Sequence, residues 1–209
     1  MKKYNGASAI LLLGSKSASR QMLLRQAQIP FLCVEQSADE TACDWNLPLI
    51  QLVNAIALCK MEHVILQPGK QEGDICFVLT ADTMSQDQDG TIRGKPSDQR
   101  DAKTKIIAAR NGVFLCTAFC LDKKVWQNGQ WQHMYRINQQ VTSEFYYDVP
   151  DAWTDLYLER SWSMNASGAI AVEDYGAQFL KTVSGSHSTI IGLPMFQVRQ
   201  ALEDLNFFR

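Results

Sequence analysis

Hydroxyl and cationic side chains gather in residues 14–20, which read Gly-Ser-Lys-Ser-Ala-Ser-Arg and follow an apolar run. Serine hydroxyls, the cations Lys16 and Arg20, and the free amides at the start of a helix are all groups that bind anions. The spacing differs from that of a P-loop and from the glycine pattern of a dinucleotide-binding turn. The stretch therefore predicts a loop for a small anion, with Ser15, Ser17 and Arg20 as candidate ligands.

Carboxylates follow two of the apolar runs. Asp82 comes at the end of the run that begins at residue 74, and open α/β sheets bind their ligands at the C-terminal ends of buried strands. Asp39 and Glu40 follow another strand-like run, and paired acids there are candidate metal ligands. A turn or helix-cap role for Asp82, and plain surface charge for Asp39 and Glu40, are the alternatives.

Two lysines also stand at unusual positions. Lys60 occupies the buried register of a helical pattern, so its ammonium group points into a cleft or reaches solvent along the helix end. Lys95 precedes Pro96, which biases its backbone to extended geometry and holds its side chain off any helix. A solvated loop lysine is the alternative for Lys95, so the pattern alone leaves both roles open for each lysine.

Alternating strands and helices position these residues in the first half of the chain. Strands are expected where apolar residues run without interruption, and helices where they recur every three or four residues. The residues preceding Gly112 predict strands at 8–14, 29–35 and 74–82, helices at 17–28, 48–66 and 97–110, and a loop or hairpin at 85–96.

Strands cluster in the second half. Asn128-Gly129 lies between strand-forming residues and predicts a hairpin over 125–137. Further strands are expected at 111–122 and 139–149, helices at 150–161 and 195–205, and a Gly- and Ser-rich segment at 167–195. The order predicts an α/β or α+β protein with a mixed sheet, in one domain over 1–209.

Composition narrows the class of protein. The chain has 209 residues and a formal net charge of −2, and the lack of a basic excess counts against nucleic-acid polymers as partners. No run is long enough to cross a membrane, and the apolar run near the N-terminus is too short for a signal peptide. Cys33, Cys59, Cys76 and Cys116 lie in apolar runs and are predicted to be buried free thiols, which suits a cytoplasmic protein.

Six stretches in this order resemble the Maf family of nucleoside triphosphate pyrophosphatases. The resemblance rests on "LLLGSKSASRQMLL", "IPFLCVEQSADET", "IALCK", "TADT", "GKPSD" and the closing pair "SGAIAVEDYGA" and "IIGLP". Each stretch is short, but together they cover nearly the whole chain at fitting distances. The resemblance implies an elongated mixed α/β fold, similar to the inosine-triphosphate pyrophosphatases, with a central mixed sheet and a cleft between two lobes.

The resemblance also implies an activity. Such proteins split a nucleoside triphosphate into the monophosphate and pyrophosphate with a divalent cation, Mg²⁺ or Mn²⁺, and clear modified or surplus nucleotides. Carried over by position, Asp82 and Glu40 would be catalytic carboxylates and metal ligands. Lys60 and Lys95 would assist catalysis by holding the triphosphate, together with Ser15, Ser17 and Arg20. A homodimer is also suggested.

Two departures from the family pattern concern the base. Ser19 stands where many members have the first of two arginines, and Glu173 stands where Gln is frequent. An ionised carboxylate accepts hydrogen bonds, so Glu173 suits the two adjacent donors of guanine and the positive charge of a 7-methylated base. A preference for 7-methyl-GTP is therefore predicted, whereas "TADT" favours the alternative, dTTP or UTP.

Two other classes of function stay open at this point. One is a nucleotide-sensing regulator of cell division with little turnover. The other is an unrelated α/β nucleotide-binding protein that matches these stretches by chance. The full set of acids and bases favours the enzyme, because a protein that only binds nucleotides has no need of Asp82.

Overall fold

A single sheet organises residues 10–208, which the computed structural model describes. The sheet has seven strands in the order β2-β1-β3-β5-β6-β7, with β4 paired to β3 beside this path. The strands are β1 (Leu11–Leu13), β2 (Phe31–Cys33), β3 (Ile75–Asp87), β4 (Ile92–Arg93), β5 (Val113–Gln127), β6 (Gln130–Tyr147) and β7 (Leu180–Gly185).

The sheet is mixed, as predicted. β1 runs parallel to both β2 and β3, while β3, β5, β6 and β7 pair antiparallel. β1 lies between two strands, and its residues Leu11 and Leu13 are fully buried. β2 lies at the edge of the sheet, where Leu32 is 57% exposed. The parallel part is therefore small, and antiparallel strands make up the rest of the sheet.

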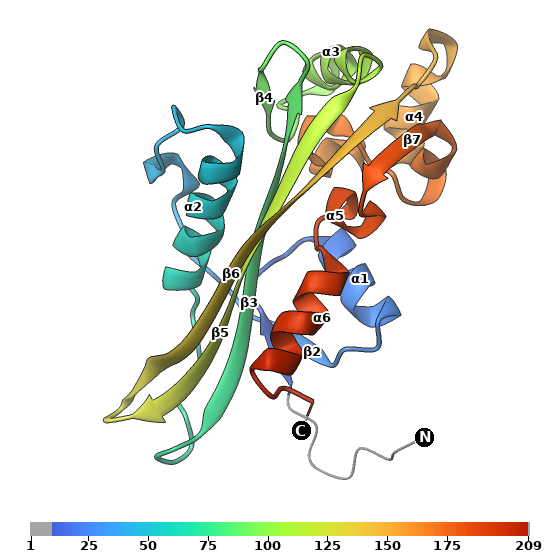
Figure 1. Ribbon diagram of the computed structural model, residues 1–209. Helices are drawn as coiled ribbons and strands as arrows, with labels where there is room; N and C mark the ends of the chain where they lie inside the picture. The colour runs from blue at the N-terminus through green and yellow to red at the C-terminus, as the bar shows by residue number, and fades with distance from the viewer. Residues whose placement is uncertain (1–9, 209) are drawn as a thin grey trace.

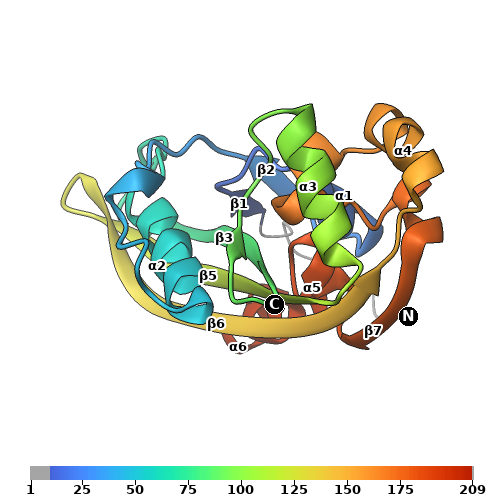
Figure 2. The ribbon, with the colours of Figure 1, turned by 90° about the horizontal axis from the view of Figure 1, so that it is seen from above.

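Helices cover both faces of the long strands (Figure 1). They are α1 (Ala18–Gln26), α2 (Leu49–Glu62), α3 (Gln99–Ala109), α4 (Thr154–Arg160), α5 (His187–Ile191) and α6 (Met195–Asp204), with 3₁₀ turns that include η1 (Glu40–Ala42), η4 (Ser167–Ala169) and η5 (Asp174–Phe179). Viewed from above, α2 lies on the inner side of the curved sheet and α6 on its outer side (Figure 2). Within residues 10–208, no helix has the length and apolar character needed to span a bilayer.

The alternation of side chains along β3 decides which residues face which helix. Phe77 and Leu79 pack in one core with Leu23 of α1 and Leu202 of α6. The intervening Val78 packs on the other face, beside the end of α2. By this period of two, Thr80 and Asp82 face α2 and Thr83 faces the side of α1, so a single strand serves two sides of the site.

Several predicted boundaries shift in the structure. β6 runs without a break from Gln130 to Tyr147, where two separate segments were predicted, because it pairs with β5 along most of its length. The hairpin at Asn128-Gly129 is confirmed. α2 ends at Glu62, before the predicted end at residue 66, because Val64 forms a bridge to Gln36. Residues 8 and 9 of the first predicted strand lie outside the described residues.

The predicted burial of the cysteines is wrong for most of them. Of the four, Cys116 is buried, Cys59 and Cys76 are half-buried, and Cys33 is exposed because β2 is an edge strand. Burial raises the pKa of both Cys76 and Cys116 to about 12. All four are free thiols, and the two with raised pKa values stay protonated at neutral pH and are poor nucleophiles.

Candidate active site

One ammonium group joins two carboxylates at the centre of the site. Lys60 Nζ lies 2.7 Å from Asp82 Oδ1 and 2.9 Å from Glu40 Oε1. The side chain of Lys60 is only 10% exposed, so it is ion-paired inside the protein and does not extend into solvent along the end of α2. Helix α2, strand β3 and turn η1 each supply one of these groups. Three residues that the sequence singled out therefore meet in one place.

Asp82 does not end its strand, and the prediction that it does is wrong. β3 continues to Asp87 because Asp82 pairs with Ala118 of the antiparallel strand β5. On its other side, β3 pairs with β1 only as far as Leu79, which lies opposite Leu13. Asp82 therefore lies beyond the carboxyl end of parallel strand β1, and such a position is where α/β sheets bind ligands.

The loop between β1 and α1 is held by its own serines. Gly14 packs so closely on β3 that a Cβ atom there would lie 2.9 Å from Thr80 Cγ2. Ser17 Oγ accepts the Arg20 amide at 3.4 Å as the N-cap of α1. Ser15 Oγ accepts the Ser17 amide at 3.2 Å. Each serine uses its oxygen as an acceptor in these contacts, which leaves its hydroxyl hydrogen available to an anion.

Arg20 joins the first loop to β3 and to the segment after α5 through three hydrogen bonds. It is 8% exposed, and each of its three guanidinium nitrogens donates within the protein. Nε donates to Gly192 O (2.9 Å), Nη1 to Ser15 Oγ (3.2 Å) and Nη2 to Thr83 Oγ1 (3.1 Å). Burial lowers the pKa of Arg20, and the charges of the two nearby carboxylates oppose this shift. An arginine stays cationic in this setting, so Arg20 carries a fixed positive charge beside the two acids.

The two departures from the family pattern contact each other. Ser19 Oγ donates to Glu173 Oε1 at 2.6 Å, across 154 positions of sequence. Glu173 precedes η5 and Ser19 lies in the first turn of α1, so this bond joins the first loop to the closing segment. Both side chains are half-buried. The predicted pair of base-contacting residues is therefore one hydrogen-bonded unit.

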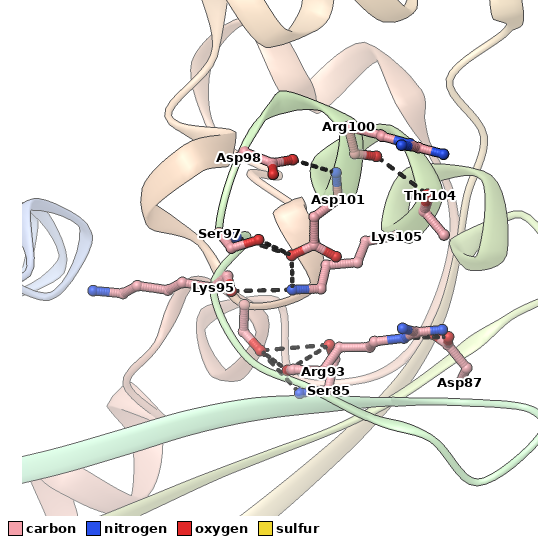
Figure 3. Close-up of polar contacts among 11 residues, drawn as sticks. Ser85, Asp87, Arg93, Lys95, Ser97, Asp98, Arg100, Asp101, Thr104 and Lys105 are labelled. Carbon is pink, nitrogen blue, oxygen red and sulfur yellow. Dashed lines mark hydrogen bonds and ion pairs between the residues drawn. The ribbon is translucent and has the colours of Figure 1, made fainter. Parts of the chain in front are cut away.

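Lys95 lies in a loop whose backbone is fixed but whose side chain is free. Lys105 Nζ donates to Lys95 O at 3.0 Å and lies 2.7 Å from Asp101 Oδ2, which also accepts the Ser97 amide (Figure 3). The Lys95 side chain is exposed and extends away from this cluster (Figure 3). Within residues 10–208 its Nζ has no hydrogen bond or ion pair, so the structure does not join Lys95 to the other site residues.

The Lys95 loop is nevertheless tied to the segment that leads to Glu173. Ser167 Oγ donates to Arg93 O at 2.6 Å, and the Gly168 amide donates to Gly94 O at 3.0 Å. Ser85 of β3 completes this contact, because its amide donates to Ser167 Oγ at 3.0 Å. The backbone that precedes Lys95 and the segment that leads to Glu173 are thus held together beside Ser85 of β3.

The sequence did not predict that two threonines, Thr83 of the "TADT" stretch and Thr117, lie behind Arg20. Thr83 Oγ1 lies 2.9 Å from Thr117 Oγ1, and Thr117 donates in turn to Thr189 O at 2.8 Å. Thr117 is fully buried in β5. A buried strand position usually carries an apolar residue, so the hydroxyls at these positions were the one signal that could have marked them.

The acidic residues suit a hard divalent cation that arrives with its ligand. Across the described part of the chain, no group of three or more His, Cys, Asp or Glu side chains could hold a metal ion. The donor set is therefore the two carboxylates of Asp82 and Glu40. Mg²⁺ commonly takes one or two carboxylates and completes its shell with waters and phosphate oxygens, so these residues fit the ion in combination with a phosphate compound.

Comparisons with known proteins extend over nearly the whole chain. A family model described as Maf-like protein matches residues 10–205. The chain is 30% identical over 202 residues to a nucleoside triphosphate pyrophosphatase of Mycobacterium sp. (strain JLS), a match covering 94% of each chain. It is 29% identical over 201 residues to a dTTP/UTP pyrophosphatase of Acholeplasma laidlawii (strain PG-8A), covering 94% of this chain and 97% of the relative. A solved structure of a HAM1 protein from Coxiella burnetii is 13% identical, with a TM-score of 0.37 and coverage of 94% and 96%.

Proposed function

Because the chain belongs to the Maf-like protein family, we propose that it hydrolyses a nucleoside triphosphate to the monophosphate and pyrophosphate. The observation that carries this proposal is the ion-paired group of Lys60, Asp82 and Glu40. It lies near the buried cation Arg20 and the serines of the first loop. The two acids suit a substrate with a reactive phosphorus centre, and the cations and hydrogen-bond donors suit its large negative charge.

Each residue of the group has a distinct task in this proposal. Lys60 holds Asp82 through Oδ1, and among the described residues nothing donates to Asp82 Oδ2. That oxygen can accept a proton from the water that attacks the phosphorus atom. Arg20, Ser15 and Ser17 bind the phosphate oxygens and neutralise the charge that develops on the leaving pyrophosphate.

We extend the proposal to a divalent cation, Mg²⁺ or Mn²⁺, held by Asp82 and Glu40. When bound, such an ion lowers the pKa of a water ligand and neutralises phosphate charge. Glu40 is the more exposed of the two acids, with 42% of its side chain accessible. It can therefore turn from Lys60 toward an incoming ion without disrupting the buried Lys60–Asp82 pair.

For the base, we propose a guanine-type substrate, with 7-methyl-GTP preferred. Glu173 is supported by Ser19 at Oε1, which orients the carboxylate and leaves Oε2 and a second lone pair of Oε1 to accept from the two donors of guanine. The alternative is dTTP or UTP, which the name of the Acholeplasma laidlawii relative favours. Catalytic efficiencies for 7-methyl-GTP, GTP, UTP and dTTP decide between them, and a lead for UTP or dTTP would overturn the preference for guanine.

The reaction itself is tested by product analysis. Pyrophosphate should be the first product from a panel of nucleoside triphosphates, with activity abolished by a chelator and restored by Mg²⁺ or Mn²⁺. Orthophosphate as the first product would contradict the proposal. Tight nucleotide binding with no turnover under any of these conditions would favour the nucleotide-sensing regulator instead.

A further inference from the structure

We infer that Thr117 is a positioning residue for the phosphate site, because it fixes the Arg20 guanidinium through Thr83. The inference rests on the proposed function, since it assigns Arg20 to a phosphate ligand. Thr83 and Thr117 lie directly opposite each other on β3 and β5. Thr83 ends the "TADT" stretch and Thr117 lies in no such stretch, and the sequence alone gave neither threonine a role of its own.

The hydrogen bonds run in one direction along this chain of groups. Thr117 Oγ1 donates to Thr189 O at 2.8 Å, which uses its single hydroxyl hydrogen. In the 2.9 Å contact between the two threonines, Thr83 must therefore be the donor and Thr117 the acceptor. Arg20 Nη2 then donates to Thr83 Oγ1 at 3.1 Å. The order of donation is Arg20 to Thr83, Thr83 to Thr117, and Thr117 to the Thr189 carbonyl, with no step that can be reversed.

A second contact closes this chain into a ring. Arg20 Nε donates to Gly192 O at 2.9 Å, and the Gly192 amide donates to Ser188 O at 3.1 Å. Gly192 adopts φ = +130°, a conformation that L side chains rarely adopt. The Thr189 carbonyl lies within α5 and the Gly192 carbonyl in its C-cap, so α5 and its cap hold Arg20 from two directions.

Burial makes the ring stiff. Thr117 and Thr189 are fully buried, Arg20 is 8% exposed and Thr83 is half-buried, so water cannot readily replace the Thr117 hydroxyl. A cation at the head of a chain of hydroxyls also polarises each bond that follows. Removal of the Thr117 hydroxyl would leave Thr83 without its acceptor and free Arg20 to reorient.

The ring leaves Arg20 able to bind an anion in one orientation. A guanidinium has five N–H groups, and the three bonds described use one from each nitrogen. Nη1 and Nη2 therefore keep one N–H each. Thr117 itself has both of its contacts inside the protein, so its effect on a ligand must pass through Thr83 and Arg20.

The test compares Thr117→Val, which removes the hydroxyl at nearly constant shape, with Thr117→Ser, which keeps it. Thr80→Val is the matched control, because Thr80 is also fully buried on β3 and donates to Ala57 O at 2.8 Å, but on the α2 face. The readouts are the affinity for inorganic tripolyphosphate by calorimetry, and kcat and KM for a nucleoside triphosphate. Thr117→Val should weaken tripolyphosphate binding and raise KM by roughly tenfold, the scale of one hydrogen bond to a charged group.

Thr117→Ser should stay within about threefold of wild type, and Thr80→Val should bind and react normally apart from a small loss of stability. Thr83→Val should match Thr117→Val. The double variant should lose no more than either single one, because both interrupt the same chain. If Thr117→Val folds poorly, Thr83→Val serves in its place, because it interrupts the same chain of hydrogen bonds at a half-buried position.

Three results with the variants would overturn the inference. These are normal tripolyphosphate binding by Thr117→Val, an equal loss in Thr117→Ser, or additive losses in the double variant. Failure of the proposed function looks different, because the wild-type protein would then bind tripolyphosphate through this ring yet release no pyrophosphate. A wild-type protein that does not bind tripolyphosphate would contradict the inference directly.

Discussion

Two buried aspartates on the α2 face of the sheet differ in the number of cationic groups that bind their carboxylates. Asp82 on β3 pairs with Ala118, and Asp122 on β5 pairs with Val78, so the two lie a short way apart on neighbouring strands. Both bind cationic side chains at hydrogen-bonding distance. One of them belongs to the candidate active site, and the other does not.

The two aspartates differ in how completely they are bonded. Asp122 is fully buried, and Arg136 grips it through two nitrogens at 2.7 and 2.8 Å. Lys124 Nζ lies 2.9 Å from Asp122 Oδ2, and Arg136 also reaches Glu62. Asp82 has one such contact among the described residues, from Lys60 to Oδ1. Both oxygens of Asp122 are bound by cationic groups, so its role is structural. Within residues 10–208, Asp82 has one oxygen without such a partner, and this oxygen can bind a ligand.

The largest effect that follows from this comparison is on stability. Asp122→Asn removes the charge that compensates Arg136 and Lys124, and loss of one partner of a buried pair costs about 3 kcal/mol or more. For a chain of this size that corresponds to a fall in Tm of roughly 10 °C. Thermal unfolding followed by circular dichroism measures it, with kcat of the folded protein as control. A variant as stable as wild type would show that the Asp122 network is not structural.

The second effect is on turnover. Asp82→Asn keeps the shape of the side chain but removes the group proposed to accept a proton, so kcat should fall roughly a hundredfold or more. Nucleotide binding and the fold should persist, because Asn can still accept from Lys60 and Glu40 still compensates the Lys60 charge. Steady-state kinetics beside a binding measurement separate the two effects. Wild-type turnover in Asp82→Asn would remove this residue from the mechanism.

The sequence could single out Lys60 and Asp82 because each of them interrupts an apolar pattern. Lys60 stands in the buried register of α2 and Asp82 in the apolar run of β3. Their contacts could not be predicted in the same way. The bond from Ser19 to Glu173 joins positions 154 residues apart, and such pairs depend on how distant elements pack.

A charged residue that interrupts an apolar run can have either a functional or a structural role. Asp122 interrupts an apolar run much as Asp82 does, yet its role depends on Arg136, which β6 brings opposite it in the ladder. Long-range pairing with β5 also extends β3 past Asp82 to Asp87. The propensities of neighbouring residues do not predict this extension. A single sequence therefore indicates which residues carry charge inside the protein, but not which of them have all their hydrogen-bonding positions occupied.

A third effect concerns pH. Burial raises the pKa of Asp122, but hydrogen bonds and charges from Arg136 and Lys124 outweigh it, and the net pKa is lowered. A lowered pKa in the folded state contributes stability that is complete above the unfolded value, about 3.9, and is lost as pH falls through the folded value. The stability gap between wild type and Asp122→Asn should therefore be constant near neutral pH and narrow in acid below about pH 4. Urea midpoints from pH 7 to pH 3 measure the gap, and a gap independent of pH would contradict the assignment of its cause.

The smallest effect tests whether Lys95, a lysine without an ion-pair partner in the described part of the chain, contributes to phosphate binding at the Asp82 site. Lys95 is exposed and has no partner for its Nζ among residues 10–208, whereas the Lys124 side chain is 12% exposed and ion-paired. Lys95→Ala should lower kcat/KM about fivefold through a lost phosphate contact and leave Tm unchanged, since an exposed unpaired lysine adds little stability. Lys124→Ala should show the reverse, with lower Tm and an unchanged rate, because its partner Asp122 is buried. If Lys95→Ala retains the wild-type rate, Lys95 is a solvated loop residue and the charge needed by the site comes from the other cations, Lys16, Arg20 and Lys60.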